Sequence, residues 1–145
     1  MAESRATAVW EGDLASGAGR VAPASGAFGE QPVTWAARTE RPDPKTSPEE
    51  LLAAAHAACY AMALSHTLAG AGTPPERLEV SATCRFEPSG EGFGITSIDL
   101  HVQGTVPGLD QAGFARAAEQ GEEGCPVSNA LRGNVAIALT ATLRS

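Results

Sequence analysis

The stretch that decides the fold is SPEELLAAAHAACYAMALSHTLAG, residues 47–70 of the chain. Ser47 is a favoured N-cap residue, Pro48 suits the first position of a helix, and an acid three residues after the cap completes a capping box. Gly70 or Gly72 is expected to end the helix, because two prolines follow shortly afterwards. The sequence therefore predicts a long helix with both ends defined by local chemistry.

This helix carries no Asp, Glu, Lys or Arg between Leu51 and Leu68. The run is dominated by alanine and contains His56, Ser65 and His66, which favours a buried helix over a membrane span. A helix that is apolar all round must be covered all round, and a single sheet in so short a chain cannot cover it. A second copy of the chain is the simplest cover, so we expect a homodimer with the long helices near its centre.

The segments on either side of the helix alternate between apolar and polar residues, as half-buried strands do. The expected strands are residues 4–12, 19–24, 31–40, 77–88, 93–106 and 134–144. Short helices are expected over residues 109–120 and 125–131. This order indicates an α+β fold of antiparallel sheets around a long central helix, in one domain over residues 1–145.

The composition narrows the classes of function. The 145 residues include 10 Lys and Arg against 17 Asp and Glu, which gives a net charge of −7. Because no basic block is present, we expect no nucleic-acid partner. The N-terminal residues lack the apolar segment of a secretory signal, so we expect a cytoplasmic protein with no membrane partner.

Three cysteines, an odd number, argue against a secreted disulfide scaffold. Cys84 lies between Ala82 and Phe86 on the apolar face of an expected strand, where a buried thiol that packs as a small hydrophobe explains it. Cys59 lies in the middle of the long helix, beyond the reach of the N-terminal dipole. It is either core filler or a reactive thiol whose pKa must be lowered by a cation outside the helix.

Cys125 is the opposite case, because EEGCPVSNAL puts it at or next to the N-cap of a short helix with Pro126 at the first position. A sulfur atom there lies near free backbone N–H groups, which favour the thiolate. The neighbouring Glu122 and Glu123 oppose that effect. An inert helix start is the alternative interpretation.

A metal site is not indicated by the spacing of the cysteines and histidines. No two cysteines are spaced C-x-x-C, and His56, Cys59 and His66 supply two or three ligands at best. His56 by itself is more typical of a satisfied core histidine. No nucleotide-binding fingerprint is present either, so we expect neither a metal nor another bound cofactor.

Three stretches match one known family: SPEELLAAAHAACYAMALS (47–65), EEGCPVSNAL (122–131) and AVWEGD (8–13). On these motifs the chain resembles the OsmC branch of the OsmC/Ohr hydroperoxide reductases over nearly its whole length. The resemblance implies an intertwined homodimer with the active site at the subunit interface. It also implies a two-cysteine thiol peroxidase without a prosthetic group, in which Cys59 is peroxidatic and Cys125 is resolving.

The same resemblance assigns two charged residues to the site. It places Arg38, from the third expected strand, and Glu49, from the helix start, beside the reactive cysteine. The favoured substrates would be organic and lipid-derived hydroperoxides, and the reductant a dithiol, with lipoylated proteins as the expected donor. The apolar residues near Cys59 that would favour such a substrate are Tyr60, Met62 and Leu64.

Helix geometry adds a condition, because Glu49 and Cys59 are ten residues apart, or about 15 Å along the axis. Arg38 cannot easily reach both within one chain. Two antiparallel helices crossing near Ala54 would bring Glu49 of one subunit beside Cys59 of the other, so we expect each site to be built from both subunits. Two alternatives stay open: a redox switch or binding module that uses the same disulfide without turnover, and a structural dimer with merely buried cysteines.

Overall fold

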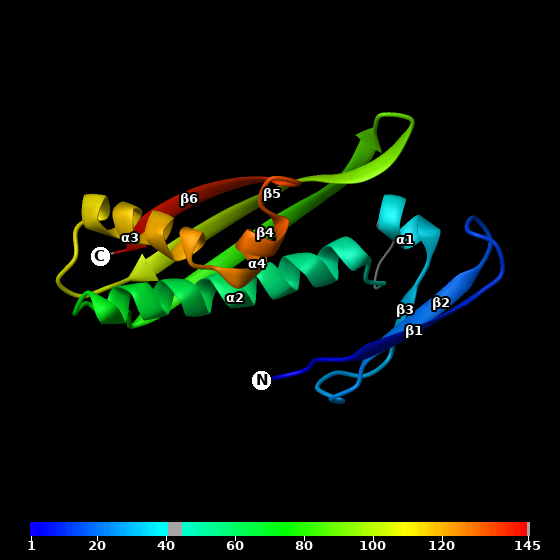
Figure 1. Ribbon diagram of the computed structural model, residues 1–145, viewed down its shortest axis with the longest axis horizontal. Helices are drawn as coiled ribbons and strands as arrows, with labels where there is room; N and C mark the ends of the chain where they lie inside the picture. Colours follow the sequence, from blue (N-terminus) through cyan, green and yellow to red (C-terminus); the bar gives the residue numbers. More distant parts are fainter. Residues whose placement is uncertain (41–44, 145) are drawn as a thin grey trace. The chain divides into compact units, whose positions relative to one another are not determined.

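The structure is a computed structural model, which describes residues 1–40 and 45–144 (Figure 1). These residues form two compact units, one within residues 1–51 and one from residue 52 onward. The prediction of a single domain over the whole chain stays a prediction.

The first unit contains a small antiparallel sheet in the order β1-β2-β3. Its elements are β1 (Ala6–Glu11), β2 (Ala18–Pro23), β3 (Gln31–Val33) and the short helix α1 (Trp35–Thr39). All six residues of β1 are exposed. The strands expected over residues 4–12 and 19–24 are confirmed, but this sheet has no face that is well buried within the chain.

The strand expected over residues 31–40 is wrong beyond Val33, because the chain turns into α1 there. The Thr34 hydroxyl accepts a hydrogen bond from the backbone N–H of Ala37 at 3.0 Å and caps the helix. Such a local bond offers the backbone an alternative to a strand ladder. Arg38 therefore lies on a helix and not, as predicted, on the third strand.

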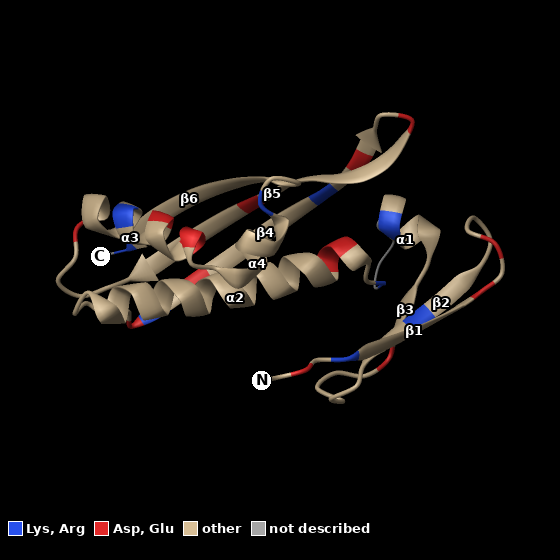
Figure 2. Cartoon of the chain, in the orientation of Figure 1, with Lys and Arg blue, Asp and Glu red and all other residues tan. Residues whose placement is uncertain are grey.

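Helix α2 (Pro48–Gly70) has the ends that the sequence predicts. At its start, the Ser47 hydroxyl accepts a hydrogen bond from the backbone N–H three residues later at 3.1 Å. At its end, the N–H of Thr73 donates to the carbonyl of Leu68 at 2.9 Å, across Gly72 in the left-handed region. Figure 2 shows that the helix carries no charged side chain beyond its first turn.

The second unit contains a three-stranded sheet in the order β4-β5-β6. Its elements are β4 (Arg77–Ser89), β5 (Gly92–Thr105), α3 (Gln111–Glu123), α4 (Pro126–Leu131) and β6 (Ala136–Arg144). The hairpin β4–β5 is antiparallel, but β5 and β6 are parallel, so the prediction of purely antiparallel sheets is wrong for this pair. The connection through α3 and α4 is long enough for the crossover that parallel strands need, and alternation alone does not specify strand direction.

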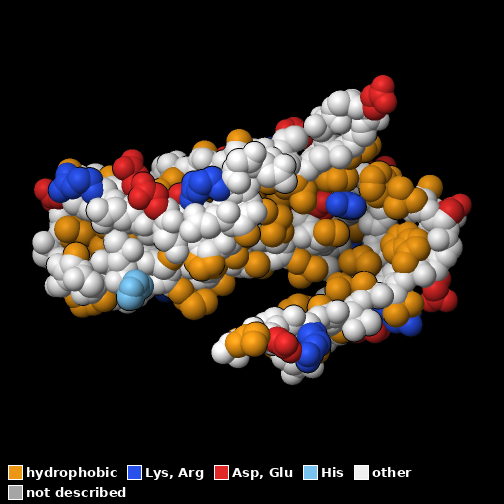
Figure 3. All heavy atoms as spheres, viewed as in Figure 1, with side chains coloured by type: hydrophobic (Ala, Val, Ile, Leu, Met, Phe, Trp, Pro, Cys, Tyr) orange, Lys and Arg blue, Asp and Glu red, His pale blue; other side chains and the backbone are white. Residues whose placement is uncertain are grey.

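Helix α2 packs on this sheet with one face only. The residues of its buried stripe are His56, Tyr60, Leu64 and Leu68. The exposed residues beyond its first turn are Ala54, Ala55, Ala58, Met62, His66, Ala69 and Gly70. Figure 3 shows apolar side chains exposed along this exposed side of the second unit. By length and composition alone α2 could cross a membrane, a test that core helices also pass. The helix expected to be covered all round is thus half covered within the chain.

Two glycines allow α3 to lie close to its neighbours. A Cβ atom on Gly121 would come within 3.0 Å of the Leu64 Cα atom, and one on Gly104 would come within 2.5 Å of the Phe114 ring. The contact at Gly104 is closer than real Cβ atoms come, and the contact at Gly121 is tighter than nine in ten real Cβ contacts. The lack of a side chain at both glycines therefore lets α3 lie against α2 and β5. The C-terminal end of α3 leads directly to Cys125.

Candidate active site

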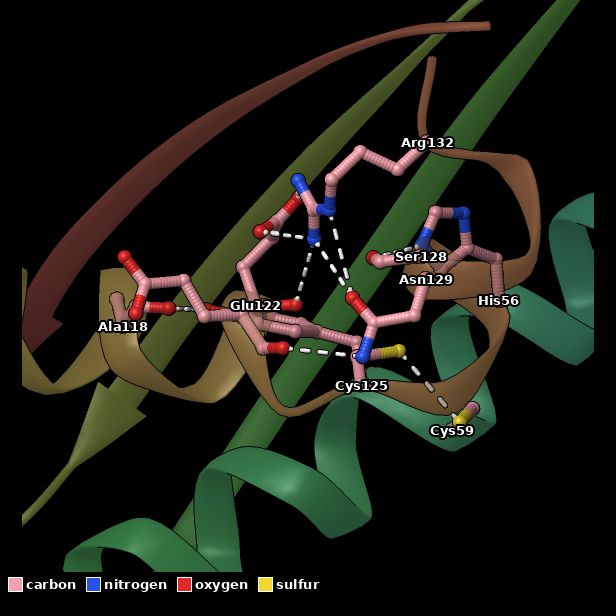
Figure 4. A network of polar contacts seen from close by, with 10 residues as sticks. His56, Cys59, Ala118, Glu122, Cys125, Ser128, Asn129 and Arg132 are labelled. Carbon is pink, nitrogen blue, oxygen red and sulfur yellow. Dashed lines mark hydrogen bonds and ion pairs between the residues drawn. The ribbon is translucent and has the colours of Figure 1, made fainter. Parts of the chain in front are cut away.

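Two cysteines from distant parts of the sequence meet in the second unit (Figure 4). Cys59 lies in the middle of α2, Cys125 lies at the N-cap of α4, and their sulfur atoms are 3.5 Å apart. Both thiols are free, with Cys125 fully buried and Cys59 half-buried. Because a disulfide has an S–S length of about 2.05 Å, an approach of roughly 1.5 Å would join them.

The start of α4 acts on Cys59 rather than on Cys125. The Cys125 side chain makes no capping hydrogen bond. Instead, the backbone N–H of Val127 hydrogen-bonds to the Cys59 sulfur, which lowers the pKa of that thiol. The N–H groups that the sequence suggested would favour a Cys125 thiolate therefore serve the other cysteine.

The pKa of Cys59 is nevertheless raised above its ordinary value. Burial is the main cause, and the hydrogen bond and charge of Cys125 add to it, while the Val127 N–H opposes them. Among the residues that the structure describes, the groups that shift the pKa of Cys59 include no cation. The surroundings within the second unit thus favour the thiol over the reactive thiolate.

A buried polar contact lies beside the sulfur pair. The His56 Nε2 and Ser128 Oγ atoms are 2.7 Å apart, and neither side chain is exposed. The His56 Nδ1 atom has no hydrogen-bond partner within residues 1–40 and 45–144. Burial lowers the pKa of His56 and the charge of Glu122 partly opposes this, so the imidazole is neutral at pH 7. The prediction of a core histidine is confirmed by the burial of His56, but only Nε2 is satisfied among the described residues, and sequence reasoning missed its partner Ser128.

The junction between α3 and α4 is held by a second polar network, drawn in Figure 4. Arg132 donates to both carboxylate oxygens of Glu122, at 3.0 and 2.9 Å. The Asn129 amide donates to the carbonyl of Glu123 at 3.1 Å, and the N–H of Cys125 donates to the carbonyl of Glu122 at 3.2 Å. Glu122, which the sequence suggested would oppose a Cys125 thiolate, is thus paired with a guanidinium.

Arg38 and Glu49, both in the first unit, form an ion pair. Arg38 Nε donates to Glu49 Oε1 at 2.7 Å, and Glu49 is only 5% exposed. The second oxygen, Glu49 Oε2, has no hydrogen-bond partner among the described residues. The Arg38 guanidinium also lies 6.0 Å from the centroid of the Trp35 ring, within cation–π range. The structure therefore brings together the two charged residues that the resemblance singled out.

An apolar pocket of about 290 Å³ lies next to this ion pair, within the first unit. The lining residues are Trp10, Leu14, Val33, Thr34, Trp35, Arg38 and Pro48. The guanidinium is the one charged group in this lining. Such a pocket suits a ligand with an apolar body and an electron-rich end.

The apolar residues that the sequence placed near the substrate have other surroundings. Tyr60 and Leu64 are fully buried in the core, and the Tyr60 hydroxyl donates to the carbonyl of Ala118 at 2.9 Å. Met62 is 69% exposed on the other side of α2. Of these three candidates Met62 alone is exposed, because helical spacing buries Tyr60 and Leu64 on the opposite face of α2.

Cys84 lies on β4 opposite Ile98 and packs against the core, as its position in the alternating pattern predicts. Within the described part of the chain, no group of three or more His, Cys, Asp or Glu side chains is placed to hold a metal ion. Cys59 and Cys125 are the two thiols that the described structure brings together.

Comparison with known proteins shows the family of the chain. The family model for the OsmC-like protein matches residues 41–140. The chain belongs to the OsmC-like family. The peroxiredoxin OsmC of Escherichia coli (strain K12) is 39% identical over 128 residues, which are 88% of this chain and 89% of that protein. An organic hydroperoxide resistance protein of Xanthomonas axonopodis pv. citri is 33% identical over 96 residues, 66% of each chain.

Solved structures share the fold over the whole length. An organic hydroperoxide resistance protein from Elizabethkingia anophelis has a TM-score of 0.77 and 26% identity, over 99% of this chain and 98% of that one. An OsmC-like protein from Mycoplasma pneumoniae has a TM-score of 0.75 over 99% of both chains, at 19% identity. The family resemblance seen in the three sequence motifs is confirmed.

Proposed function

We propose that this chain reduces organic hydroperoxides to alcohols through a Cys59 sulfenate and a Cys59–Cys125 disulfide. As a member of its family, the chain is a cysteine-based peroxidase, and relatives named for peroxiredoxin activity and organic hydroperoxide resistance support the substrate class. The observation that carries the proposal is the distance of 3.5 Å between the two sulfur atoms.

The proposed reaction has three steps. The Cys59 thiolate attacks the terminal oxygen of the hydroperoxide, the O–O bond breaks, and the alkoxide leaves as the alcohol after it takes up a proton. Cys59 is then a sulfenic acid, and the Cys125 thiol condenses with it, forming the disulfide and releasing water. An external dithiol reduces that disulfide by two exchange steps and is itself oxidised.

Arg38 supplies the positive charge that Cys59 needs in this proposal. The pKa of Cys59 is raised within the second unit, so an external cation must favour the thiolate. Arg38 is held by the nearly buried Glu49, which fixes the direction of the guanidinium. We assign Arg38 to stabilising the thiolate and orienting the peroxide, and Glu49 to holding Arg38.

The proposed working form is an intertwined homodimer, with each site built from both subunits. Two features of the single chain support it. Helix α2 has an exposed apolar side, and β1 is exposed throughout. Glu49 precedes Cys59 by ten residues on α2, about 15 Å along the axis, which favours a contribution from the other subunit.

The proposed substrates are hydroperoxides with an apolar body, such as those derived from lipids. The aromatic pocket beside Arg38 supports this choice, because an apolar tail gains from burial there whereas hydrogen peroxide gains nothing. No metal or prosthetic group enters the reaction. The reductant is a dithiol, for which lipoylated proteins are the proposed source, and the proposed location is the cytoplasm.

A turnover assay separates this proposal from its main alternative, a peroxide-responsive switch. The protein is mixed with an excess of cumene hydroperoxide and a dithiol, and the alcohol formed per subunit is counted. A peroxidase forms many equivalents and a switch forms one. Peptide mapping of peroxide-treated protein should show Cys59 joined to Cys125; turnover without that disulfide would overturn the two-cysteine mechanism.

A further inference from the structure

The contact between His56 and Ser128 joins the same two parts of the chain as the contact between Cys59 and Cys125. His56 comes three residues before Cys59 on α2, and Ser128 comes three residues after Cys125 on α4. Residues three apart on a helix lie on the same face, one turn from each other. The imidazole–hydroxyl contact and the sulfur contact therefore join the same two helices, one turn apart (Figure 4).

Contacts at two points fix the orientation of one helix on another, which a contact at one point leaves free. The sulfur contact and the hydrogen bond from the Val127 N–H both meet α2 at Cys59, so with these alone α4 could rotate about that one residue. Helix α4 is only six residues long, so its position relative to α2 depends on such side-chain contacts. The hydrogen bond of 2.7 Å fixes the second point of attachment.

We propose that His56 and Ser128 are positioning residues, which hold α2 and α4 in the register that lets Cys125 meet oxidised Cys59. This inference rests on the proposed function and assigns that site two residues beyond the cysteines and the charged pair. Neither residue touches the reacting atoms. Their contribution is the effective concentration of one sulfur at the other.

The energetics favour a positioning role over a purely stabilising one. Burying an imidazole and a hydroxyl in an apolar core costs free energy that their hydrogen bond only about offsets, and His56 Nδ1 stays without a partner among the described residues. Replacing both side chains with apolar ones should therefore change the stability little. The pair provides direction, since a hydrogen bond between two fully buried side chains depends on their mutual orientation.

The test is the thiol–disulfide equilibrium of the full-length protein with reduced and oxidised dithiothreitol, read by peptide mass spectrometry. Ser128→Ala is expected to lower the effective concentration of the Cys59–Cys125 pair by about tenfold. The double variant that combines Ser128→Ala with His56→Leu is expected to lower it by about as much. His56→Gln keeps a polar group that can reach Ser128 and should recover most of the loss. If His56→Leu fails to fold, Ser128→Ala and His56→Gln carry the test alone.

The matched control is Tyr60→Phe, which removes another buried hydrogen bond of α2, from Tyr60 to the carbonyl of Ala118. It should lower the melting temperature about as much as Ser128→Ala while leaving the disulfide equilibrium unchanged. Equal equilibria in Ser128→Ala and wild type, or equal losses in Ser128→Ala and Tyr60→Phe, would overturn the inference.

The experiment also keeps this inference apart from the proposed function. A wild-type protein that forms the disulfide with dithiothreitol but consumes no peroxide would reject the function, and the positioning role would be decided by the equilibria alone. A wild-type protein that forms no Cys59–Cys125 disulfide with either oxidised dithiothreitol or a hydroperoxide would overturn both.

Discussion

The sulfur pair and the Arg38–Glu49 pair are built in opposite ways. Arg38 and Glu49 are eleven residues apart, carry opposite charges and satisfy each other at 2.7 Å. Cys59 and Cys125 are 66 residues apart, and the Cys125 thiol makes ionisation of Cys59 harder. In the proposed mechanism the second unit closes the disulfide, but its own groups leave the pKa of Cys59 raised. The proposal therefore takes the activating charge from a separate part of the protein, and the following experiments test that division.

The largest effect is expected from Cys59→Ser, which removes the nucleophile. Turnover of an organic hydroperoxide should fall to the background rate, because a serine hydroxyl does not ionise near pH 7 and cannot form a sulfenic acid. Alcohol formation in the presence of a dithiol is the measurement. Residual turnover above background would show that another thiol is peroxidatic.

Cys125→Ser separates the proposed resolving role of Cys125 from the peroxidatic role of Cys59. The first equivalent of peroxide should still react, but the Cys59 sulfenic acid should then progress to sulfinic and sulfonic acid, visible as mass increases of two and three oxygen atoms. Cys84→Ala is the matched control, because Cys84 packs against the core from β4 and is not part of the proposed reaction, and it should retain turnover. Normal turnover in Cys125→Ser would contradict the resolving role.

Arg38→Ala tests whether the positive charge of Arg38, in the first unit, favours the thiolate of Cys59, in the second unit. Loss of the cation should lower the rate constant for peroxide reduction about hundredfold at pH 7, since a neighbouring opposite charge moves a pKa by roughly 1–3 units. The midpoint of the pH–rate profile should move to higher pH, because the thiolate of Cys59 loses its stabilising partner. Glu49→Gln should cost less, about tenfold, because the guanidinium remains but loses its charged anchor.

Arg20→Ala is the control for charge in the same unit. Arg20 forms exposed ion pairs with Glu11 and Glu30. Its removal should leave the pH–rate profile in place. A profile that moves equally in Arg20→Ala and Arg38→Ala would show a general effect of charge, and the specific role of Arg38 would be wrong.

Local chemistry made much of the fold predictable. The ends of α2 follow from Ser47 and Gly72, and the faces of β4 and β5 follow from their alternation. The segment around Arg38 was assigned wrongly because its few residues fit both a strand and a helix, and one hydroxyl at Thr34 decides the outcome. The direction of β6 depends on the whole crossover through α3 and α4, which no local pattern encodes.

The candidate site divides in the same way. The position of Cys125 at a helix start was predictable from the proline that follows it, but the partner of the free N–H groups was not, because Cys59 is 66 residues away in sequence. Family resemblance linked the two cysteines. His56 and Ser128 were visible only as residues three positions from a cysteine, a spacing that acquires meaning once α2 and α4 lie together.

A smaller effect is expected at the junction that presents Cys125. Arg132→Ala removes the two contacts to the Glu122 carboxylate. The condensation of Cys125 with the sulfenic acid should slow by about threefold, since pairs with one exposed partner contribute little. Stopped-flow measurement separates this step from the unchanged first step. Arg85→Ala, which breaks the Arg85–Asp99 pair in the sheet, is the control and should alter neither step.

The smallest effect is expected on the pH dependence of the free energy of unfolding. It is measured in the wild type, with its buried His56, and in a variant that lacks this histidine. Burial lowers the pKa of His56 in the folded state, so between that pKa and about 6.5 the unfolded chain binds a proton that the folded chain does not. Stability contributed by neutral His56 is therefore present above pH 6.5 and is lost as the pH falls through this window. Urea unfolding of the wild type between pH 7.5 and pH 5 should show this loss, corresponding to uptake of at most one proton.

His56→Gln should show a shallower slope, because glutamine does not titrate. Equal slopes in the two proteins would mean that His56 is protonated in the folded state as easily as in the unfolded chain, which its burial and its contact with Ser128 argue against.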